Sequence, residues 1–176
     1  MTSTDTFMLL FRLIHVLAGA FWFGSASLVV LFLAPAAAEV GPAAGPLVSN
    51  LVLKRRLTRA VVGSGVVTVL AGAALFWQDA RRSGSLGSFV RSDFGLAMTV
   101  GALAALVALA IGLAIVAPGM ERAVRTAGSL ARLDGPPPPE QAERLRALQA
   151  RTRRASRTAL SLIAIAAAAM ATARYW

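Results

Sequence analysis

Long apolar segments alternate along the chain with shorter segments that carry most of its charges. Four of the apolar segments approach or exceed the length of about 20 residues that an α-helix needs to cross roughly 30 Å of hydrocarbon. The sequence therefore predicts an all-α, polytopic membrane protein in which four transmembrane helices form a compact bundle. We expect its 176 residues to make up a single four-helix transmembrane domain. The expected spans are residues 7–34, 59–77, 94–117 and 156–173.

The fourth span is the shortest and the richest in alanine, and residues at its outer end support it. Arg174, Tyr175 and Trp176 follow the apolar segment. An arginine can extend its charged head toward water, and amphipathic aromatic rings are enriched at the level of the lipid headgroups. These three residues therefore predict a membrane boundary at the end of the fourth span.

The composition agrees with a membrane protein. Hydrophobic residues make up 57% of the chain and charged residues 15%, whereas ordinary soluble domains have about 45–50% apolar and about 25% charged residues. The formal net charge of +10 does not predict a nucleic-acid partner, because no nucleic-acid-binding fold or basic patch with interleaved aromatic residues accompanies it. The absence of cysteine excludes disulfides, thiolate nucleophiles and cysteine-based metal centres.

Lysine and arginine residues are distributed unevenly between the two sides of the predicted bundle. Thirteen of the 18 lie in or beside the first and third connections. Cytoplasmic loops carry an excess of lysine and arginine, so we expect a multi-pass protein of the inner (cytoplasmic) membrane, with both termini outside and connections 1 and 3 in the cytoplasm. The thirteen residues are Lys54, Arg55, Arg56, Arg59, Arg122, Arg125, Arg132, Arg144, Arg146, Arg151, Arg153, Arg154 and Arg157.

Small residues recur at steps of three and four within two of the spans. In lipid, helices associate through close packing, and small residues let two backbones approach each other. The stripes predict tight helix–helix contacts, although glycine and alanine are also common elsewhere in the chain. They consist of Gly65, Thr68 and Gly72 in the second span, and of Gly101, Ala105, Ala108 and Gly112 in the third.

The third connection, residues 119–155, predicts a helical hairpin that projects into the cytoplasm. Apolar positions recur at helical spacing on both sides of a proline run that cannot continue a helix. Pro139 is well placed as the first residue of the returning helix, with Glu140 in its first turn. The arginines of the hairpin either contact a partner or anionic lipid, or lie in solvent and only set the topology. Those expected to make such contacts are Arg144, Arg146, Arg151, Arg153 and Arg154.

His15 is the only histidine of the chain. Counted from Phe7 at 1.5 Å per residue, it lies about 12 Å below the outer boundary of the first span. Three methionines are expected in the same half of the bundle: Met8 two turns above His15, Met98 in the third span and Met170 in the fourth. Imidazole and thioether groups suit Cu(I), so these four residues form a candidate copper site.

A structural role for the same residues is the open alternative. Methionine commonly fills irregular gaps in an apolar core, and a histidine in the membrane can hydrogen-bond to a neighbouring helix. Arg12 shares the face of His15, where its positive charge favours the uncharged imidazole that serves as a ligand or acceptor. Arg12 and Trp22 are the expected supporting residues of a site. We expect the Arg12 side chain to extend outward, toward Asp79 or Asp93.

Other kinds of site fit the residues less well. Haem would need a second axial ligand from a methionine or from another copy, because one chain supplies one histidine. Hydrolytic catalysis would need a base beside a serine or threonine, and the first span has no acidic residue to orient His15. An enzyme acting on a lipid or quinone would have Arg12, His15 and Trp22 as its candidate polar groups.

The segment 12–24 resembles the first helix of CopD-like copper-resistance membrane domains and of related uncharacterised four-helix small membrane proteins. Residues 70–72 and 173–175 extend the resemblance loosely over most of the chain. The resemblance implies a polytopic inner-membrane protein associated with copper uptake or resistance. Its pattern is H-x-L-x-x-x-x-W-x-G, matched here by His15, Leu17, Trp22 and Gly24.

From these observations we expect a non-enzymatic integral membrane protein that acts within the lipid bilayer through association. It would associate either with itself or with a larger membrane complex, through its packed helices and its basic hairpin. A copper-binding or copper-handling protein with its site around His15 is the alternative. A transporter acting alone is not expected, because the centres of the spans carry none of the charged residues that ion-coupled transport uses.

Overall fold

The computed structural model describes residues 3–133 and 135–175, and the regular elements in these two ranges are all helices. Asp134 and Trp176, which bear on the predicted hairpin turn and membrane boundary, lie outside the described residues. Within the described ranges, four helical stretches are long and apolar enough to cross a membrane. The protein is therefore an all-α, multi-pass membrane protein, as its hydropathy predicts. The four stretches are Thr6–Lys54, Leu57–Arg82, Asp93–Leu130 and Pro139–Tyr175.

The first span is a continuous helical rod that extends beyond its predicted end at residue 34. A wide, π-type turn precedes Pro35, whose nitrogen has no hydrogen to donate and whose ring would clash with the carbonyl one turn before. The Ala34 N–H instead bonds the carbonyl of Val29, five residues back, so the helix widens locally rather than breaking. The rod comprises α1 (Ser3–Ser27), η1 (Leu28–Leu33) and α2 (Ala34–Val40).

Sequence alone predicts a loop between the first two spans, but most of this connection is helical. Gly41, at a φ of 70°, turns the chain at the end of α2. Two of the short helices that follow, α3 (Gly45–Ser49) and η3 (Asn50–Lys54), pack against α7 (Ala117–Leu130). This packing supports a connection of low intrinsic helix propensity, since two glycines and two prolines lie between residues 41 and 46. The elements are η2 (Gly41–Ala44), α3 (Gly45–Ser49) and η3 (Asn50–Lys54).

The second and third spans are joined by a short capped helix that the hydropathy pattern does not predict. Ser85 and Ser88 cap its N-terminus reciprocally. Phe89 is 2% exposed and packs edge-on against Phe76 on one side and Phe94 on the other. These aromatic contacts fix the connection to both spans. The elements are α4 (Leu57–Arg82), α5 (Leu86–Arg91) and α6 (Asp93–Ile111).

The third and fourth spans continue into the antiparallel helical hairpin that the sequence predicts. A second wide turn, η4 (Gly112–Val116), again precedes a proline, Pro118, and leads from α6 into α7. The returning helix α8 (Pro139–Thr172) begins at the predicted proline, with Glu140 in its first turn. It ends in the short turn η5 (Ala173–Tyr175). The side of the membrane on which the hairpin lies remains a prediction.

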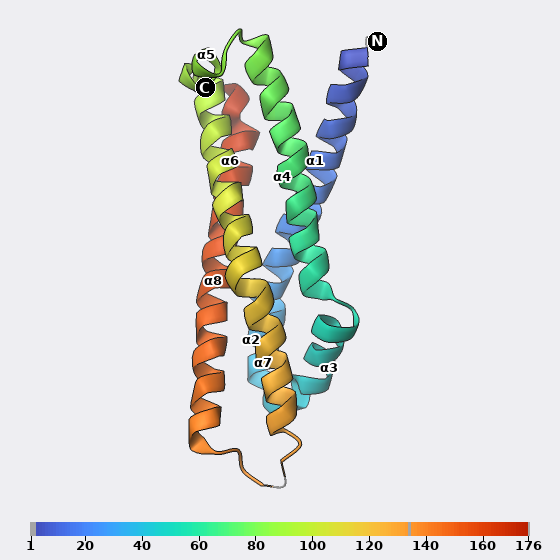
Figure 1. Cartoon of the computed structure of the whole chain (residues 1–176), viewed down its shortest axis with the longest axis vertical. Helices are drawn as coiled ribbons and strands as arrows, with labels where there is room; N and C mark the ends of the chain where they lie inside the picture. The colour runs from blue at the N-terminus through green and yellow to red at the C-terminus, as the bar shows by residue number, and fades with distance from the viewer. Residues whose placement is uncertain (1–2, 134, 176) are drawn as a thin grey trace.

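The four spans form two tightly packed pairs. Helix α1 packs along α4, and α6 packs along α8, with less extensive contact between the pairs (Figure 1). The pairs meet in a small core around Trp22 of α1, to which Ala108 of α6 and Ile163 of α8 contribute. Alanine dominates this core, and such small side chains let membrane helices approach closely.

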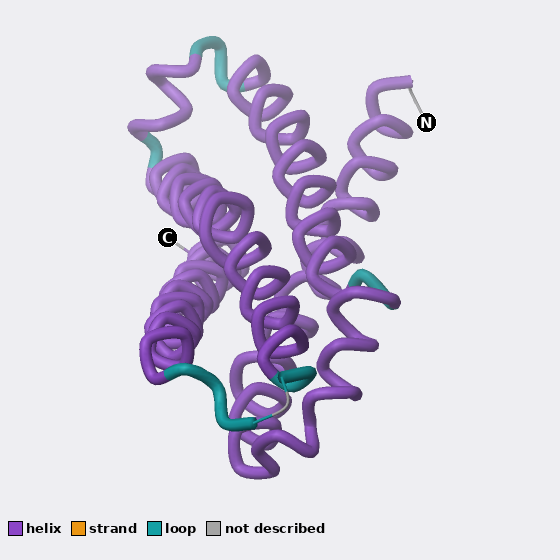
Figure 2. The backbone as a smooth tube through the Cα atoms, turned by 60° about the horizontal axis from the view of Figure 1, so that its bottom comes forward, coloured by secondary structure: helices purple, strands orange, loops and turns teal. Residues whose placement is uncertain are grey.

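Both described ends of the chain lie at the same end of the bundle, together with α5 (Figure 1). The turn between α7 and α8 lies at the opposite end, near α3, and the non-helical connections are short (Figure 2). The basic first and third connections therefore share one end. At the other end the Arg81 guanidinium lies 5.1 Å from the ring centre of Trp77, and that of Arg174 lies 4.7 Å from Tyr175. Such aromatic side chains are typical of a membrane boundary.

Candidate functional site

The interface between α1 and α4 holds the candidate site residue His15. Residues at steps of four and three along α1 share one face of that helix, as do residues at the same steps along α4. Large and small residues alternate across the contact, so each helix fills the gaps of the other. The stripe predicted in the second span is thus a contact surface. The facing pairs are His15 with Gly72, Gly19 with Thr68, and Trp22 with Gly65.

Two glycines of α4 are needed for this approach. A Cβ at Gly72 would lie 2.8 Å from Cε1 and 2.9 Å from Nδ1 of His15, and a Cβ at Gly65 would lie 2.7 Å from Cε2 of Trp22. Non-bonded carbon atoms attract each other best at about 3.5–4.0 Å. Any larger residue would therefore push the His15 or Trp22 ring away from the backbone of α4.

His15 is hydrogen-bonded to the backbone of the neighbouring helix. Its Nδ1 lies 2.8 Å from the carbonyl oxygen of Thr68. A carbonyl oxygen only accepts, so Nδ1 carries the hydrogen and donates it. The Thr68 hydroxyl does not compete for the imidazole, because it donates to the carbonyl of Ser64 at 2.7 Å. The structural role considered for His15 is thus present in the fold.

The other ring nitrogen of His15 is an acceptor in the uncharged tautomer. With Nδ1 donating to a carbonyl, Nε2 presents its lone pair. It lies 3.9 Å from the Cβ position at Gly72, farther from that position than Nδ1 or Cε1. Within residues 3–133 and 135–175, the Nδ1 contact is the only hydrogen bond of His15. The half-buried ring can therefore accept a hydrogen bond or coordinate a metal ion through Nε2.

The candidate methionines are distributed over three helices. Met8 is buried on α1, whereas Met98 on α6 and Met170 on α8 are half-buried. The side chain of Met170 lies against Gly101 of α6, where an added Cβ would be 2.9 Å from its Cγ. Met170 therefore packs between α6 and α8, and His15 packs between α1 and α4. The four-residue copper site remains a prediction.

The two expected supporting residues have different environments. Trp22 is 6% exposed and belongs to the core where the helix pairs meet. Arg12 is exposed. Among the described residues it forms no ion pair with Asp79 or Asp93, the two carboxylates toward which its side chain was expected to extend. Trp22 thus supports the packing beside His15, whereas Arg12 lies exposed on α1.

The hairpin arginines expected to contact a partner or lipid are accessible. Arg144 pairs with Glu140 at 2.6 Å, one turn away on the same exposed face. Such exposed pairs contribute little to stability, typically about 0.3–0.5 kcal/mol, so the pair leaves the guanidinium available. All five side chains lie on the exposed surface of α8: Arg144, Arg146, Arg151, Arg153 and Arg154.

A second polar region, which the sequence patterns do not identify, lies at the basic end of the bundle. A cavity of about 150 Å³ opens between the start of α4 and the side of α7. In the sequence its signal is the charged residues around the predicted start of the second span and after the predicted end of the third, which by themselves indicate topology and not a shared cavity. The lining residues are Val52, Leu53, Arg56, Arg59, Glu121 and Arg125.

The described part of the chain contains no group of three or more His, Asp or Glu residues arranged to hold a metal ion. The copper site considered for His15 would therefore need thioethers or residues of another chain. Comparison of the sequence with protein-family models and with curated proteins, and of the fold with solved structures, found no match.

Proposed function

We propose that this protein is a non-enzymatic membrane protein that acts through association, with a second copy of itself or with a membrane complex, by way of helix α1. The observation that carries the proposal is the free acceptor of His15. Its Nδ1 is committed to the Thr68 carbonyl, which leaves Nε2 without a donor inside the described bundle. A partner helix that supplies a donor would complete this hydrogen bond.

The depth of His15 makes such a partner favourable. The residue lies about 12 Å from the start of the apolar stretch, at 1.5 Å per residue. Water is scarce in the hydrocarbon core, and an unsatisfied polar group there costs free energy. Interhelical hydrogen bonds from polar side chains contribute about 0.6 kcal/mol on average and up to about 2 kcal/mol. The free acceptor therefore favours association of α1 without enforcing it.

The packing of α1 is consistent with a further neighbour. In the most apolar stretch of the first span 6% of the residues are buried, against 22% in the second span. Helix α1 packs along α4 on one side and touches α8 mainly in its second half. Its first half leaves the remaining sides open to lipid or to another helix.

Native mass spectrometry of the full-length protein, released from lipid nanodiscs, tests the proposal. The expected result is a dimer or a defined larger complex in the wild type, and a larger monomer fraction in His15→Phe. Phenylalanine keeps the aromatic ring but has no acceptor. Leu103→Ala, at an exposed position of α6, is the matched control and should leave the assembly unchanged. A wild-type monomer would refute the association, and equal assembly in His15→Phe and Leu103→Ala would refute the role of His15 in it.

Copper binding at His15 is the second candidate function. The favouring observation is the bond from Nδ1 to a backbone carbonyl, because metal-ligating histidines typically donate their other ring N–H in this way. The thioether of Met8, on the same helix, is the nearest candidate along the chain for a second soft ligand. A bound copper ion would be held at Nε2 of His15 and would provide a Cu(I) centre for metal handling.

One substitution separates the two functions. In His15→Gln the side-chain amide can donate to the Thr68 carbonyl and still offers an oxygen acceptor, but an amide oxygen is a poor ligand for Cu(I). Association predicts that His15→Gln keeps the complex that His15→Phe loses. Copper binding predicts that both variants lose the metal, measured as copper mass in the same spectra after addition of Cu(I). Metal-free protein in every sample would exclude the copper function.

A further inference from the structure

The cavity at the basic end of the bundle has the composition of an anion site. Three of its lining residues are arginines and one is a glutamate. Arg59 pairs with Glu121, with 3.3 Å between Nε and Oε1. Two guanidinium charges, those of Arg56 and Arg125, therefore remain uncompensated within the described cavity lining.

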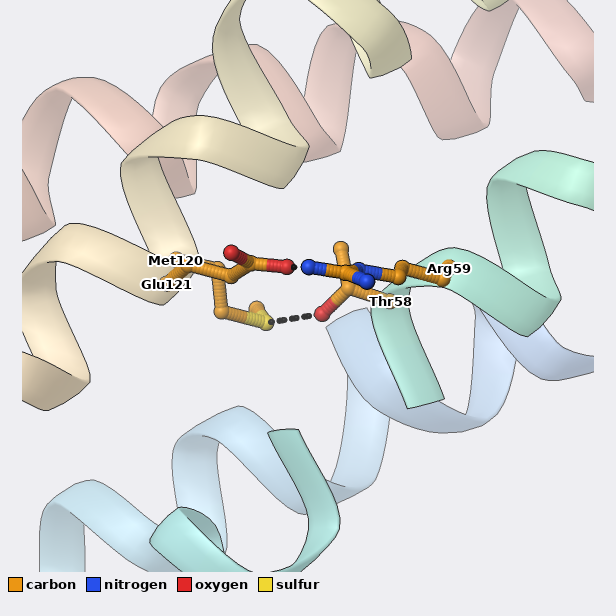
Figure 3. A network of polar contacts seen from close by, with 4 residues as sticks. All are labelled: Thr58, Arg59, Met120 and Glu121. Atoms are coloured by element: carbon orange, nitrogen blue, oxygen red, sulfur yellow. Dashed lines mark hydrogen bonds and ion pairs between the residues drawn. The ribbon is translucent and has the colours of Figure 1, made fainter. Parts of the chain in front are cut away.

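The α4–α7 contact holds the walls of the cavity in place (Figure 3). Beside the ion pair, the Thr58 hydroxyl donates to Sδ of Met120 at 3.5 Å. Thr58 is 6% exposed, so this contact lies behind the charged groups. Two consecutive residues of α4 thus contact two consecutive residues of α7. These contacts fix the first turn of α4 against α7, which forms the other wall of the cavity.

The backbone adds positive potential to the same place. Arg56 stands at the N-cap of α4 with φ 53° and ψ 34°, a left-handed conformation unusual for a residue with a side chain. It provides no side-chain cap, and the first turn of this helix contains no acidic residue. The start of a helix carries a partial positive charge and free N–H groups that bind phosphate well. Here that charge is not offset by any residue of the first turn.

The cavity lies near the level of the headgroups. Glu121 follows Phe94, at the start of the third span, by about 40 Å of helix at 1.5 Å per residue. A bilayer is about 40–45 Å thick with its headgroups. The accessible lining of the cavity is mainly polar, so a phosphate held here would have arginines around its oxygens.

We propose that this cavity binds a phosphate group, through Arg56, Arg125 and the start of α4. Arginine recognises phosphate oxygens with its planar donors, and basic pockets between transmembrane helices hold lipid headgroups. Glu121 holds Arg59 in the wall and, as a carboxylate, opposes the bound anion. The phosphate belongs either to an anionic lipid or to free phosphate. The site is independent of His15 and of the proposed association.

The test measures binding to the full-length protein in a neutral detergent, by the rise in unfolding temperature during titration. The probes are phosphatidylglycerol, phosphatidylcholine and inorganic phosphate. We expect Arg125→Gln to weaken binding roughly tenfold, as for the loss of a charge-assisted hydrogen bond. We expect Glu121→Gln to strengthen it, because that variant removes the opposing charge. Arg132→Gln, exposed and outside the cavity, removes the same charge as Arg125→Gln and should have no effect.

Arg125→Gln and Glu121→Gln are expected to change the binding affinity in opposite directions. This distinguishes a direct effect on the bound anion from a general disturbance of the fold. Saturation by inorganic phosphate alone supports the proposal with free phosphate as the ligand. Saturation by phosphatidylglycerol, with no effect of inorganic phosphate or phosphatidylcholine, supports it with a lipid headgroup as the ligand. Equal affinities in Arg125→Gln and Arg132→Gln, weaker binding in Glu121→Gln, or no response to any probe would overturn it.

Discussion

His15 donates a hydrogen bond from Nδ1 to the carbonyl oxygen of Thr68 across 2.8 Å. The bond joins a side chain of α1 to the backbone of α4, so it does not depend on which side chain occupies position 68. It depends instead on how closely the imidazole approaches α4. Gly72 permits that approach, because the imidazole ring lies where the side chain of a larger residue would begin.

Replacement of Gly72 by alanine should therefore separate α1 from α4 at this level. The new Cβ would lie 2.8 Å from Cε1 of His15, and overpacking of this kind costs about 1–3 kcal/mol. We expect the free energy of unfolding in mixed micelles to fall by that amount.

Gly63→Ala is the matched control on the same helix. A Cβ at Gly63 meets nothing within 4 Å, so alanine there should be neutral or should stabilise α4 by up to about 1 kcal/mol through its higher helix propensity. Equal changes in Gly72→Ala and Gly63→Ala would show that the contact with His15 does not limit the packing.

The sequence predicts this contact in part. Steps of three and four among small residues mark the face of α4, because helical periodicity is a local property that the order of residues reveals. The partner of His15 is a backbone carbonyl, which every residue carries, so no side-chain pattern identifies Thr68 as that partner. For the same reason the sequence leaves both the hydrogen-bonding and the ligand roles of His15 open.

The hairpin depends on a similar close approach. Gly119 of α7 faces Thr152 of α8, and an added Cβ would overlap the Thr152 hydroxyl. Gly119→Val should open the base of the hairpin and speed limited proteolysis near the proline run several-fold, because access there depends on local opening. Gly128→Val, on the same helix, is the matched control. A Cβ at Gly128 meets nothing within 4 Å, and the substitution carries the same cost in helix propensity. Proteolysis at the same rate in both variants would contradict a packed hairpin.

Arg56 should carry backbone strain at the start of α4. Its positive φ costs a non-glycine residue roughly 1–2 kcal/mol. Arg56→Gly should therefore be more stable than Arg56→Ala, because both lose the guanidinium and only glycine accepts this φ freely. Thermal unfolding of the two variants in the same detergent measures the difference. An alanine variant as stable as the glycine variant would mean that the turn relaxes.

The connection between the first two spans shows where local patterns are insufficient. Gly41, Pro42, Gly45 and Pro46 predict a loop, because glycine and proline disfavour helix. The segment is nevertheless helical. Its second part, α3, packs against α7, and a contact with a helix so distant in the sequence outweighs local propensity there. The sequence does not predict the basic cavity for a related reason, because the cavity forms only where this connection and α4 meet α7.

The orientation of the bundle is tested most directly by cysteine labelling, because the chain has no cysteine of its own. Ser83→Cys lies at the exposed end of α4 near α5, and Ser129→Cys lies at the exposed end of α7 near the hairpin turn. The excess of arginine in the hairpin predicts that it faces the cytoplasm. A membrane-impermeant maleimide should therefore label Ser83→Cys in intact cells, and Ser129→Cys only after the membrane is permeabilised. Labelling of Ser129→Cys in intact cells would contradict the proposed orientation.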